Sequence, residues 1–478
     1  MNNFSSLIST PVQILSPIVA NAEPESGSLV LAGVLLSLIV VYLASKIGGE
    51  ICARMELPAV LGELLAGVVV GVSALHLLVF PSADLTASQS MVMQLLQLTA
   101  HLDPAPLTTT FEVQSEVLST LAEMGVIILL FEIGLESDLK ELIRVGPQAA
   151  IVAVVGVVVP FALGTAGLML LFGVSSVPAI FAGAALTATS IGITARVLAE
   201  IQRLNSKEGQ IIIGAAVLDD VLGIIVLAVV ASLAKTGQVE IGNVIYLIVS
   251  AGVFLVGSLW LGLLLNPFLV SLINELRTRG QLLITALVLT FVLADVAVVI
   301  QLEAILGAFA AGLILAETEK RTELQEQVAP ISDMLVPIFF VVVGARTDLS
   351  VLNPFVPSNR EGLIMAAFLV AVAIAGKVVT GFTIFGQPEL NRLAIGVGMI
   401  PRGEVGLVFA SVGATTGTLP EALQAAVIVM VILTTFLAPP LLRVVFTNGD
   451  SVGQEDDLAI EGIAPSELLE PGIVQQDD

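Results

Sequence analysis

Residues 57-LPAVLGELLAGVVVG-71 match residues 302-LEAILGAFAAGLILA-316 later in the chain, which indicates an internal repeat. The matched pairs are Leu57/Leu302, Ala59/Ala304, Leu61/Leu306, Gly62/Gly307, Ala66/Ala311 and Gly67/Gly312. Helices rich in Leu, Ala and Gly can match by chance, and that is the alternative. A second, weaker match, 134-GLESDL-139 with 344-GARTDL-349, follows in the same order and favours a true repeat.

The composition indicates that these stretches lie in a membrane. The chain has 478 residues, of which 56% are hydrophobic and 12% are charged, and its mean hydropathy is +1.02. Soluble domains are about 25% charged, so we expect an integral membrane protein. A single cysteine and two histidines disfavour a disulfide framework and a thiolate or histidine-rich metal site. A net charge of −23 disfavours nucleic acid as a partner.

Hydrophobic runs predict an all-α integral membrane protein with about thirteen transmembrane helices, because about 20 apolar residues cross about 30 Å of hydrocarbon. The predicted spans are 29–48, 57–80, 116–136, 147–172, 176–198, 209–234, 241–264, 281–300, 302–317, 328–346, 362–386, 391–416 and 421–445. The division near Gln301 is the weakest. A single helix over 281–317 would be about 55 Å long, so we predict two spans there.

The distribution of Lys and Arg orients these spans, because cytoplasmic loops carry the excess of positive charge. If the N-terminus is outside and the C-terminus is cytoplasmic, the external side holds only Lys235, Arg346 and Arg360. The two repeat copies then start on opposite sides of the membrane and are inverted, and the first copy carries an extra external loop, roughly 81–115. Inverted repeats are typical of secondary transporters, whose binding sites are built from broken helices.

The two ends of the chain are predicted to lie outside the membrane. Residues 1–28 form an external segment in which Ala20-Asn21-Ala22 resembles a signal-peptide cleavage site. The preceding residues contain two prolines and no Lys or Arg, which favours retention of the segment. Residues 446–478 are expected to form a disordered, acidic cytoplasmic tail.

Two polar segments occupy matching positions of the two copies. The first is 187-TATSIGITARV-197, with Thr187, Thr189, Ser190 and Thr194. The second is 398-GMIPRGEVGLV-408, in which Pro401, Gly403 and Gly406 should interrupt the helix around the charged Arg402 and Glu404. Such segments are expected at a transporter's binding site. A Ser/Thr helix contact and a simple proline kink are the alternatives.

A third polar feature is 217-VLDDV-221, in the middle of a hydrophobic run. Asp219 and Asp220 should point about 100° apart on a helix, so we expect one to face a water-filled cavity and the other a partner. The best partner is Lys377, the only lysine near the middle of a predicted span. Two acids against one base leave a negative site, which prefers a cation; a purely structural ion pair is the alternative.

Four other acids are predicted to lie within the spans and have no assigned role. They are Glu63, Glu123, Glu132 and Asp295, and each could line a cavity, end a helix or lie at an interface.

Three stretches together, TATSIGITARVLAE, GAAVLDDVLGIIVLA and GMIPRGEVGLV, resemble the second family of monovalent cation:proton antiporters, the NapA-like and Kef-like exchangers. The resemblance covers about residues 29–445. It implies an antiporter fold with two crossed broken helices. It also implies a homodimer in which a core domain, about 116–234 and 328–445, moves against a dimerisation domain, about 29–80 and 241–317.

The resemblance also implies roles for individual residues. Asp220 would bind Na⁺ or H⁺, Asp219 would pair with Lys377, and Thr189 would contribute an oxygen to Na⁺. The residues that support the broken helices would be Thr187, Ser190, Arg402 and Glu404. The electroneutral branch has Asn where this chain has Asp219, so we expect electrogenic exchange. Kef-like proteins carry a large nucleotide-binding domain after the last span, where this sequence has about 33 residues, so we expect no dinucleotide gating within it.

We therefore predict a secondary transporter that exchanges Na⁺, or else Li⁺ or K⁺, for H⁺ by alternating access. If Na⁺ draws Asp219 away from Lys377, the lysine can release a second proton. A K⁺/H⁺ antiporter and a channel-like K⁺ pathway are the alternatives. An enzyme is disfavoured because the sequence shows no convincing nucleophile or metal cluster. We expect no cofactor, and a location in a bacterial-type inner or plasma membrane or an internal energy-transducing membrane.

Overall fold

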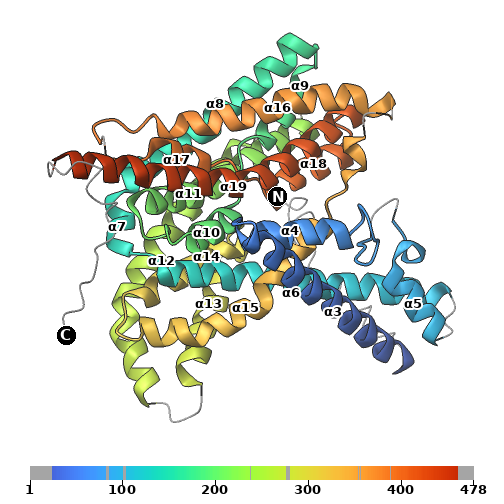
Figure 1. Cartoon of the computed structure of the whole chain (residues 1–478), viewed down its shortest axis with the longest axis horizontal. Helices are drawn as coiled ribbons and strands as arrows, with labels where there is room; N and C mark the ends of the chain where they lie inside the picture. Colours follow the sequence, from blue (N-terminus) through green and yellow to red (C-terminus); the bar gives the residue numbers. More distant parts are fainter. Residues whose placement is uncertain are drawn as a thin grey trace, which may run out of the picture. The chain divides into compact units, whose positions relative to one another are not determined.

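The computed structural model describes residues 24–81, 85–100, 104–236, 238, 240–275, 280–353, 355, 357–387 and 389–460. Every regular element in these ranges is a helix (Figure 1), in agreement with the all-α prediction. Residues 1–23, which include the Ala20-Asn21-Ala22 sequence, lie outside the described residues, as do residues 461–478 of the acidic tail. The predictions for those two segments stay predictions.

The helices group into two units, and each unit combines two separate stretches of the chain. Unit 1 consists of Met1–Leu139 and Glu240–Ile364, and unit 2 consists of Lys140–Val239 and Met365–Asp478. Each unit therefore takes one stretch from each copy of the repeat.

The helices of unit 1 are α3 (Pro24–Arg54), α4 (Ala59–Val70), η1 (Ala87–Gln89), α5 (Met91–Ala100), α6 (Pro104–Glu136), α12 (Ile241–Glu275), α13 (Gln281–Val299), α14 (Ala304–Ala316), α15 (Arg321–Ala345) and η2 (Leu349–Leu352). Those of unit 2 are α7 (Leu139–Arg144), which starts at the boundary, α8 (Gly146–Phe172), α9 (Ser176–Ala185), α10 (Ile191–Glu200), α11 (Lys207–Thr236), α17 (Arg392–Gly398), α18 (Glu404–Thr415) and α19 (Glu421–Ile460). Helix α16 (Pro357–Gly381) begins in unit 1 and continues into unit 2.

Glycines at matching repeat positions make two equivalent helix contacts in unit 1. A Cβ atom added at Gly67 in α4 would overlap the backbone of α15 near Gly344, and one added at Gly344 would overlap α4 near Gly67. In the same way, Gly312 in α14 and Gly134 in α6 lie against each other's helices. Gly67 corresponds to Gly312 and Gly134 to Gly344, so each copy contributes one helix to each contact. This exchange of partners is expected from an inverted repeat.

Helix length does not confirm the count of thirteen spans. Among the described residues, nine helices are long and apolar enough to cross a membrane, and α4, α9 and α14 are shorter apolar helices. The 12 residues of α4 and the 13 of α14 extend about 18 to 20 Å, less than the hydrocarbon thickness. The chain does break between α13 and α14, where Gln301 has a φ of 67°, so 281–317 is two helices as predicted.

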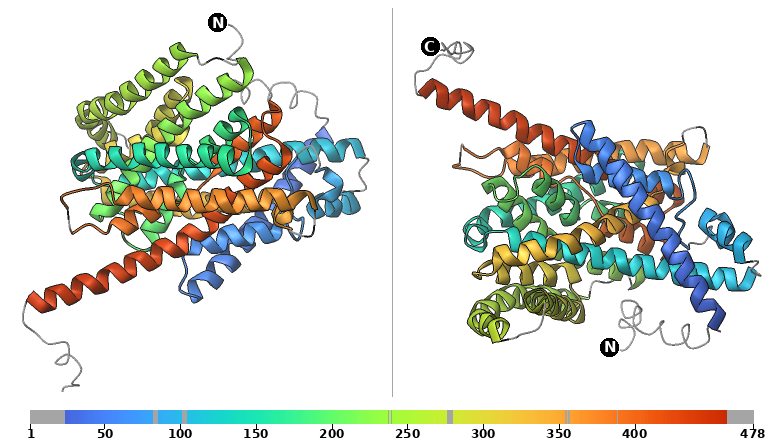
Figure 2. Two further views of the ribbon diagram at one scale, coloured as in Figure 1. Left: turned by 90° about the horizontal axis from the view of Figure 1, so that it is seen from above. Right: turned by 60° about the horizontal axis from the view of Figure 1, so that its bottom comes forward.

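Three regions differ from the sequence-based description. The external loop predicted at 81–115 contains η1, α5 and the first turns of α6, because Val92, Met93 and Leu96 in α5 pack into an apolar cluster with Leu107 and Phe111 of α6. Helix α19 continues to Ile460, so the first part of the predicted tail is helical (Figure 2).

The third difference concerns the predicted domains. The predicted core domain included 116–136 and 328–346, but α6 and α15 pack within unit 1 through the glycine contacts with α14 and α4. The assignment of one unit to movement and the other to dimerisation stays a prediction.

Unit 2 is held together around two interrupted helices. Helix α11 packs against α8, α9, α10 and α17, while α18 and α19 pack against each other. Helix α16 lies against α8, where Gly376 contacts Pro160 and the rings of Phe368 and Phe172 lie 5.4 Å apart. The polar residues singled out in the sequence therefore come together inside this unit.

Candidate functional site

Both predicted helix breaks are present in unit 2. The first crossing segment, residues 186–190, separates α9 from α10, and the second crossing segment, residues 399–403, separates α17 from α18. Pro401 and Gly403 lie in the second break, as expected from the missing N–H of proline and the conformational freedom of glycine. Gly406 was also expected to interrupt the helix, but it lies within α18, where it packs against Val431.

Hydrogen bonds tie the two crossing segments together. The Ser190 backbone N–H donates to the Pro401 carbonyl at 2.8 Å, and an added Cβ at Gly403 would lie only 2.8 Å from Ser190 Oγ. The Thr189 hydroxyl donates to the Met399 carbonyl at 3.1 Å, and Thr194 donates to the Gly398 carbonyl at 2.9 Å. These hydroxyls satisfy carbonyls at the C-terminal end of α17, which have no partner within their own helix.

Arg402 donates hydrogen bonds to the backbone carbonyls that follow the C-terminal end of α9. Its side chain is fully buried, and its Nη1 donates to the carbonyls of Thr187, at 3.1 Å, and Ala188. A cation at a helix C-terminus offsets the negative end of the helix dipole. The Arg402 carbonyl in turn accepts a hydrogen bond from Thr435 Oγ1 at 2.6 Å. Arg402 thus braces the two broken helices, as the sequence suggested.

Two other residues were predicted to support the broken helices, Thr187 and Glu404. The Thr187 hydroxyl bonds within its own turn, to the Ala184 carbonyl at 2.8 Å, and only its backbone carbonyl reaches the second crossing segment through Arg402. Glu404 starts α18, but the position of its side chain lies outside what the structure describes. Its predicted bracing role stays a prediction.

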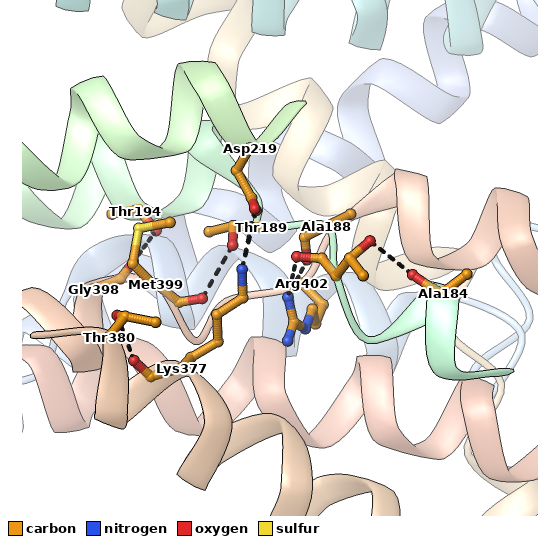
Figure 3. Close-up of polar contacts among 11 residues, drawn as sticks. Ala184, Ala188, Thr189, Thr194, Asp219, Lys377, Thr380, Gly398, Met399 and Arg402 are labelled. Atoms are coloured by element: carbon orange, nitrogen blue, oxygen red, sulfur yellow. Dashed lines mark hydrogen bonds and ion pairs between the residues drawn. The ribbon is translucent and has the colours of Figure 1, made fainter. Parts of the chain in front are cut away.

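The two aspartates lie near the middle of α11, and both are buried, with exposed fractions of 0% for Asp219 and 5% for Asp220. Lys377 Nζ donates to both carboxylate oxygens of Asp219, at 3.1 and 3.3 Å (Figure 3). The Lys377 side chain is also fully buried. Because adjacent residues diverge by about 100° on a helix, the Asp219 pair with Lys377 turns Asp220 toward a different direction.

Three residues that the sequence did not reveal complete the surroundings of this pair. An added Cβ at Gly156 in α8 would lie 3.1 Å from Lys377 Nζ, so the absence of a side chain there makes room for the ammonium group. The Thr380 hydroxyl donates to the Lys377 carbonyl at 2.6 Å, and Thr435 holds Arg402. A glycine or threonine in a membrane helix is common, so nothing in the sequence marks these as special.

The charges of the site differ from the sequence-based count. That count set two acids against Lys377 alone, but the structure also buries Arg402 in the same unit. Unit 2 therefore buries two bases, Lys377 and Arg402, as well as the two acids. With all four groups ionised the site carries no net charge, rather than the negative charge first expected.

The remaining predicted intramembrane acids lie outside unit 2. Glu63 is buried in α4 and accepts a hydrogen bond from Ser45 at 2.9 Å, and Glu132 in α6 accepts one from Ser332. Glu123 in α6 and Asp295 in α13 are exposed in the described chain. All four belong to unit 1, whereas Asp219 and Lys377 belong to unit 2.

Comparison with known proteins gives consistent matches along the chain. The sequence model of the family described as "Sodium/hydrogen exchanger, transmembrane" matches residues 27–447. The high-affinity Na⁺/H⁺ antiporter NhaS3 of Synechocystis is 68% identical over 435 residues, which cover 90% of this chain and 94% of that protein. The Na⁺/H⁺-K⁺ antiporter GerN of Bacillus cereus is 30% identical over 86% of this chain and 95% of its own length.

A solved structure also matches. The sodium proton antiporter MjNhaP1 from Methanocaldococcus jannaschii aligns with a TM-score of 0.55 at 18% identity, over 90% of this chain and 98% of that chain. At this level of identity the match shows a shared fold.

Proposed function

The chain belongs to the sodium/hydrogen exchanger family, and on that premise we propose that it exchanges Na⁺ for H⁺ across a membrane. The observation that carries the proposal is the buried Asp219–Lys377 pair beside Asp220, next to two crossed helix breaks. Buried titratable groups beside non-helical backbone are the expected features of an ion-binding site in a transporter. The name of the relative that is 68% identical, a high-affinity Na⁺/H⁺ antiporter, supports the same function.

Exchange follows from competition at one carboxylate. Asp220 would hold either a proton or Na⁺, and Thr189 would contribute oxygen to the metal ion. The Thr189 hydroxyl donates a hydrogen bond to the Met399 carbonyl, which leaves the lone pairs of the hydroxyl oxygen able to face a cation. Since the site is neutral with all four charged groups ionised, entry of Na⁺ adds one positive charge. Release of a proton from Lys377, in addition to the proton that Na⁺ displaces from Asp220, would exchange two H⁺ for one Na⁺ and make exchange electrogenic.

Further features of the proposal concern the whole protein. Alternating access would arise from movement of a core domain, about 116–234 and 328–445, against a dimerisation domain, about 29–80 and 241–317. The protein would be a homodimer with the N-terminus outside and the C-terminus in the cytoplasm. No bound cofactor and no enzymatic step are required, because the transported ions carry the coupling. The inner or plasma membrane, or an internal energy-transducing membrane, would supply the ion gradients.

K⁺/H⁺ antiport is the second candidate function. The printed name of GerN, which is 30% identical to this chain, includes K⁺ as well as Na⁺. A buried carboxylate with hydroxyl and carbonyl oxygens does not by itself select one alkali ion over another.

Cation-driven proton flux in proteoliposomes tests the proposal. Addition of Na⁺ to vesicles with an imposed pH gradient should dissipate that gradient in a saturable manner, and Asp220→Asn should abolish the response. Li⁺ and K⁺ in parallel identify the preferred ion, and a change of rate with membrane potential distinguishes electrogenic from electroneutral exchange. A non-saturable cation flux without proton movement would show a channel instead.

A further inference from the structure

Two donor atoms of Arg402 make no hydrogen bond with any residue that the structure describes. They are Nε and Nη2, and both are buried. The third nitrogen, Nη1, donates to the Thr187 and Ala188 carbonyls. Buried N–H groups almost always make a hydrogen bond in folded proteins, so two buried donors without an acceptor on one side chain need an explanation.

The backbone that carries Arg402 is held in place. Its carbonyl accepts from Thr435 Oγ1 at 2.6 Å, and the preceding carbonyl, of Pro401, accepts from the Ser190 N–H at 2.8 Å. The side chain has no exposed surface. Because Nη1 and the backbone are both fixed, an acceptor for the other two nitrogens has to move toward them.

The two unpaired nitrogens form one edge of the guanidinium group. Nε and the Nη atom beside it present two parallel N–H donors, a geometry that matches the two oxygens of a carboxylate. A carboxylate is therefore the acceptor that would satisfy both donors at once.

Asp219 is the carboxylate that can serve as this acceptor. It is fully buried in the same unit, on α11, which packs against both α17 and α18, the helices on either side of the segment that carries Arg402. In this structure its oxygens bind Lys377, and Figure 3 draws this ion pair together with Arg402. A change of side-chain rotamer or a small helix movement would exchange one cation for the other.

We propose that Arg402 is the second partner of Asp219, which moves from Lys377 Nζ to the Nε/Nη2 edge of Arg402 when Na⁺ occupies the site. The inference rests on the proposed function, because it requires Na⁺ to bind at Asp220. A buried carboxylate that left Lys377 without a second cation would be strongly unfavourable. Arg402 is thus a positioning residue that keeps Asp219 paired in both states.

A double-mutant cycle on Na⁺ binding tests this exchange. Na⁺ dissociation constants would be taken from the Na⁺-dependent rise in unfolding temperature of the purified full chain. We expect Arg402→Gln to weaken Na⁺ binding about tenfold with Asp219 present, and less than about twofold in an Asp219→Asn background, as for residues in direct contact. Equal weakening in both backgrounds would overturn the proposal, because it is what a role confined to bracing the helix breaks predicts.

Two further variants separate charge, geometry and folding. Arg402→Lys keeps a cation that can reach the carbonyls but lacks the two-donor edge, so its effect on Na⁺ affinity should be intermediate. Arg196→Gln removes an arginine from α10 that pairs with Glu200 at 3.3 Å, and it should bind Na⁺ within about twofold of the wild type. An Arg402 variant that folds only together with Asp219→Asn supports the pairing, whereas one that fails to fold in both backgrounds contradicts it.

The outcomes also distinguish this inference from the proposed function. A wild-type protein without a Na⁺-dependent stability shift and without Na⁺-driven proton flux would contradict the function itself. Normal binding and flux with no coupling between Arg402 and Asp219 would contradict only the partner exchange.

Discussion

Replacing Gly156 by alanine should disturb the Lys377–Asp219 pair while leaving the protein folded. The new Cβ would lie 3.1 Å from Lys377 Nζ and 3.5 Å from both Lys377 Cδ and Thr380 Cγ2. The closest of these contacts is tighter than nine in ten real Cβ contacts, so the ammonium group must retreat by a few tenths of an ångström. Since Nζ lies 3.1 and 3.3 Å from the Asp219 oxygens, a shift of a few tenths of an ångström changes the length or angle of both hydrogen bonds.

Two opposing contributions set the effect on stability. Alanine is favoured over glycine inside a helix by about 1 kcal/mol, whereas overpacking a buried site costs about 1 to 3 kcal/mol. The free energy of unfolding should therefore change by no more than about 2 kcal/mol. Na⁺ binding should also change, because Lys377 and Asp219 are fully buried and have no exposed surface through which water could replace a distorted hydrogen bond.

Thermal unfolding and Na⁺-driven proton flux should be measured on the same preparation. We expect Gly156→Ala to unfold within a few degrees of the wild type but to change the Na⁺ concentration for half-maximal flux several-fold. Gly223→Ala in α11 is the matched control, because its nearest neighbour would be the Ala188 Cβ at an ordinary 3.8 Å. Unchanged Na⁺ dependence in Gly156→Ala would refute the idea that this glycine positions Lys377.

Three further predictions follow from the ion pair, the helix contacts and the competition between ions. Asp219→Asn leaves Lys377 buried without its acid and should lower the free energy of unfolding by about 3 to 5 kcal/mol. Adding Lys377→Met should recover much of this loss. A double variant that shows no recovery in thermal unfolding would contradict the pairing. Gly67→Ala and Gly312→Ala should each destabilise unit 1 by about 1 to 3 kcal/mol. Gly252→Ala is the control and should not destabilise it, because an added Cβ there has no neighbour within 4 Å. Unequal losses of stability from Gly67→Ala and Gly312→Ala would argue against equivalent contacts. Where the empty site is protonated, lowering the pH by one unit should raise the half-maximal Na⁺ concentration by at least about tenfold, because Na⁺ displaces the Asp220 proton and, in the electrogenic version, a second proton from Lys377. A pH-independent value would exclude a shared site.

Much of the fold could be predicted because membrane insertion imposes strict rules on composition. A chain with 56% hydrophobic residues has few ways to satisfy its backbone in lipid, and helices are the main one. The repeat and the two helix breaks follow from spacing, and a pair between Lys377 and one of the two aspartates follows from the need of a buried charge for an opposite charge. These features depend on local sequence and on one strong pairing rule. That the partner is Asp219 was implied only by the family resemblance.

Sequence by itself could not determine how the helices are rotated and which ones touch. Residues 116–136 and 328–346 belong to unit 1 because of close glycine contacts with α14 and α4, and a hydrophobic span does not show which neighbour it will choose. The same holds for α5, whose packing against α6 turns a predicted loop into a helix.

The number of buried bases at the site was determined only by the tertiary structure. Arg402 and Asp219 are 183 positions apart in the sequence, and nothing in either segment shows that the two residues act on each other. The crossing of the two broken helices brings the guanidinium group to the end of α9, inside the unit that also buries Lys377. Periodicity and composition determine which residues enter the membrane, whereas the partners of a buried charge depend on distances of a few ångströms that only packing sets.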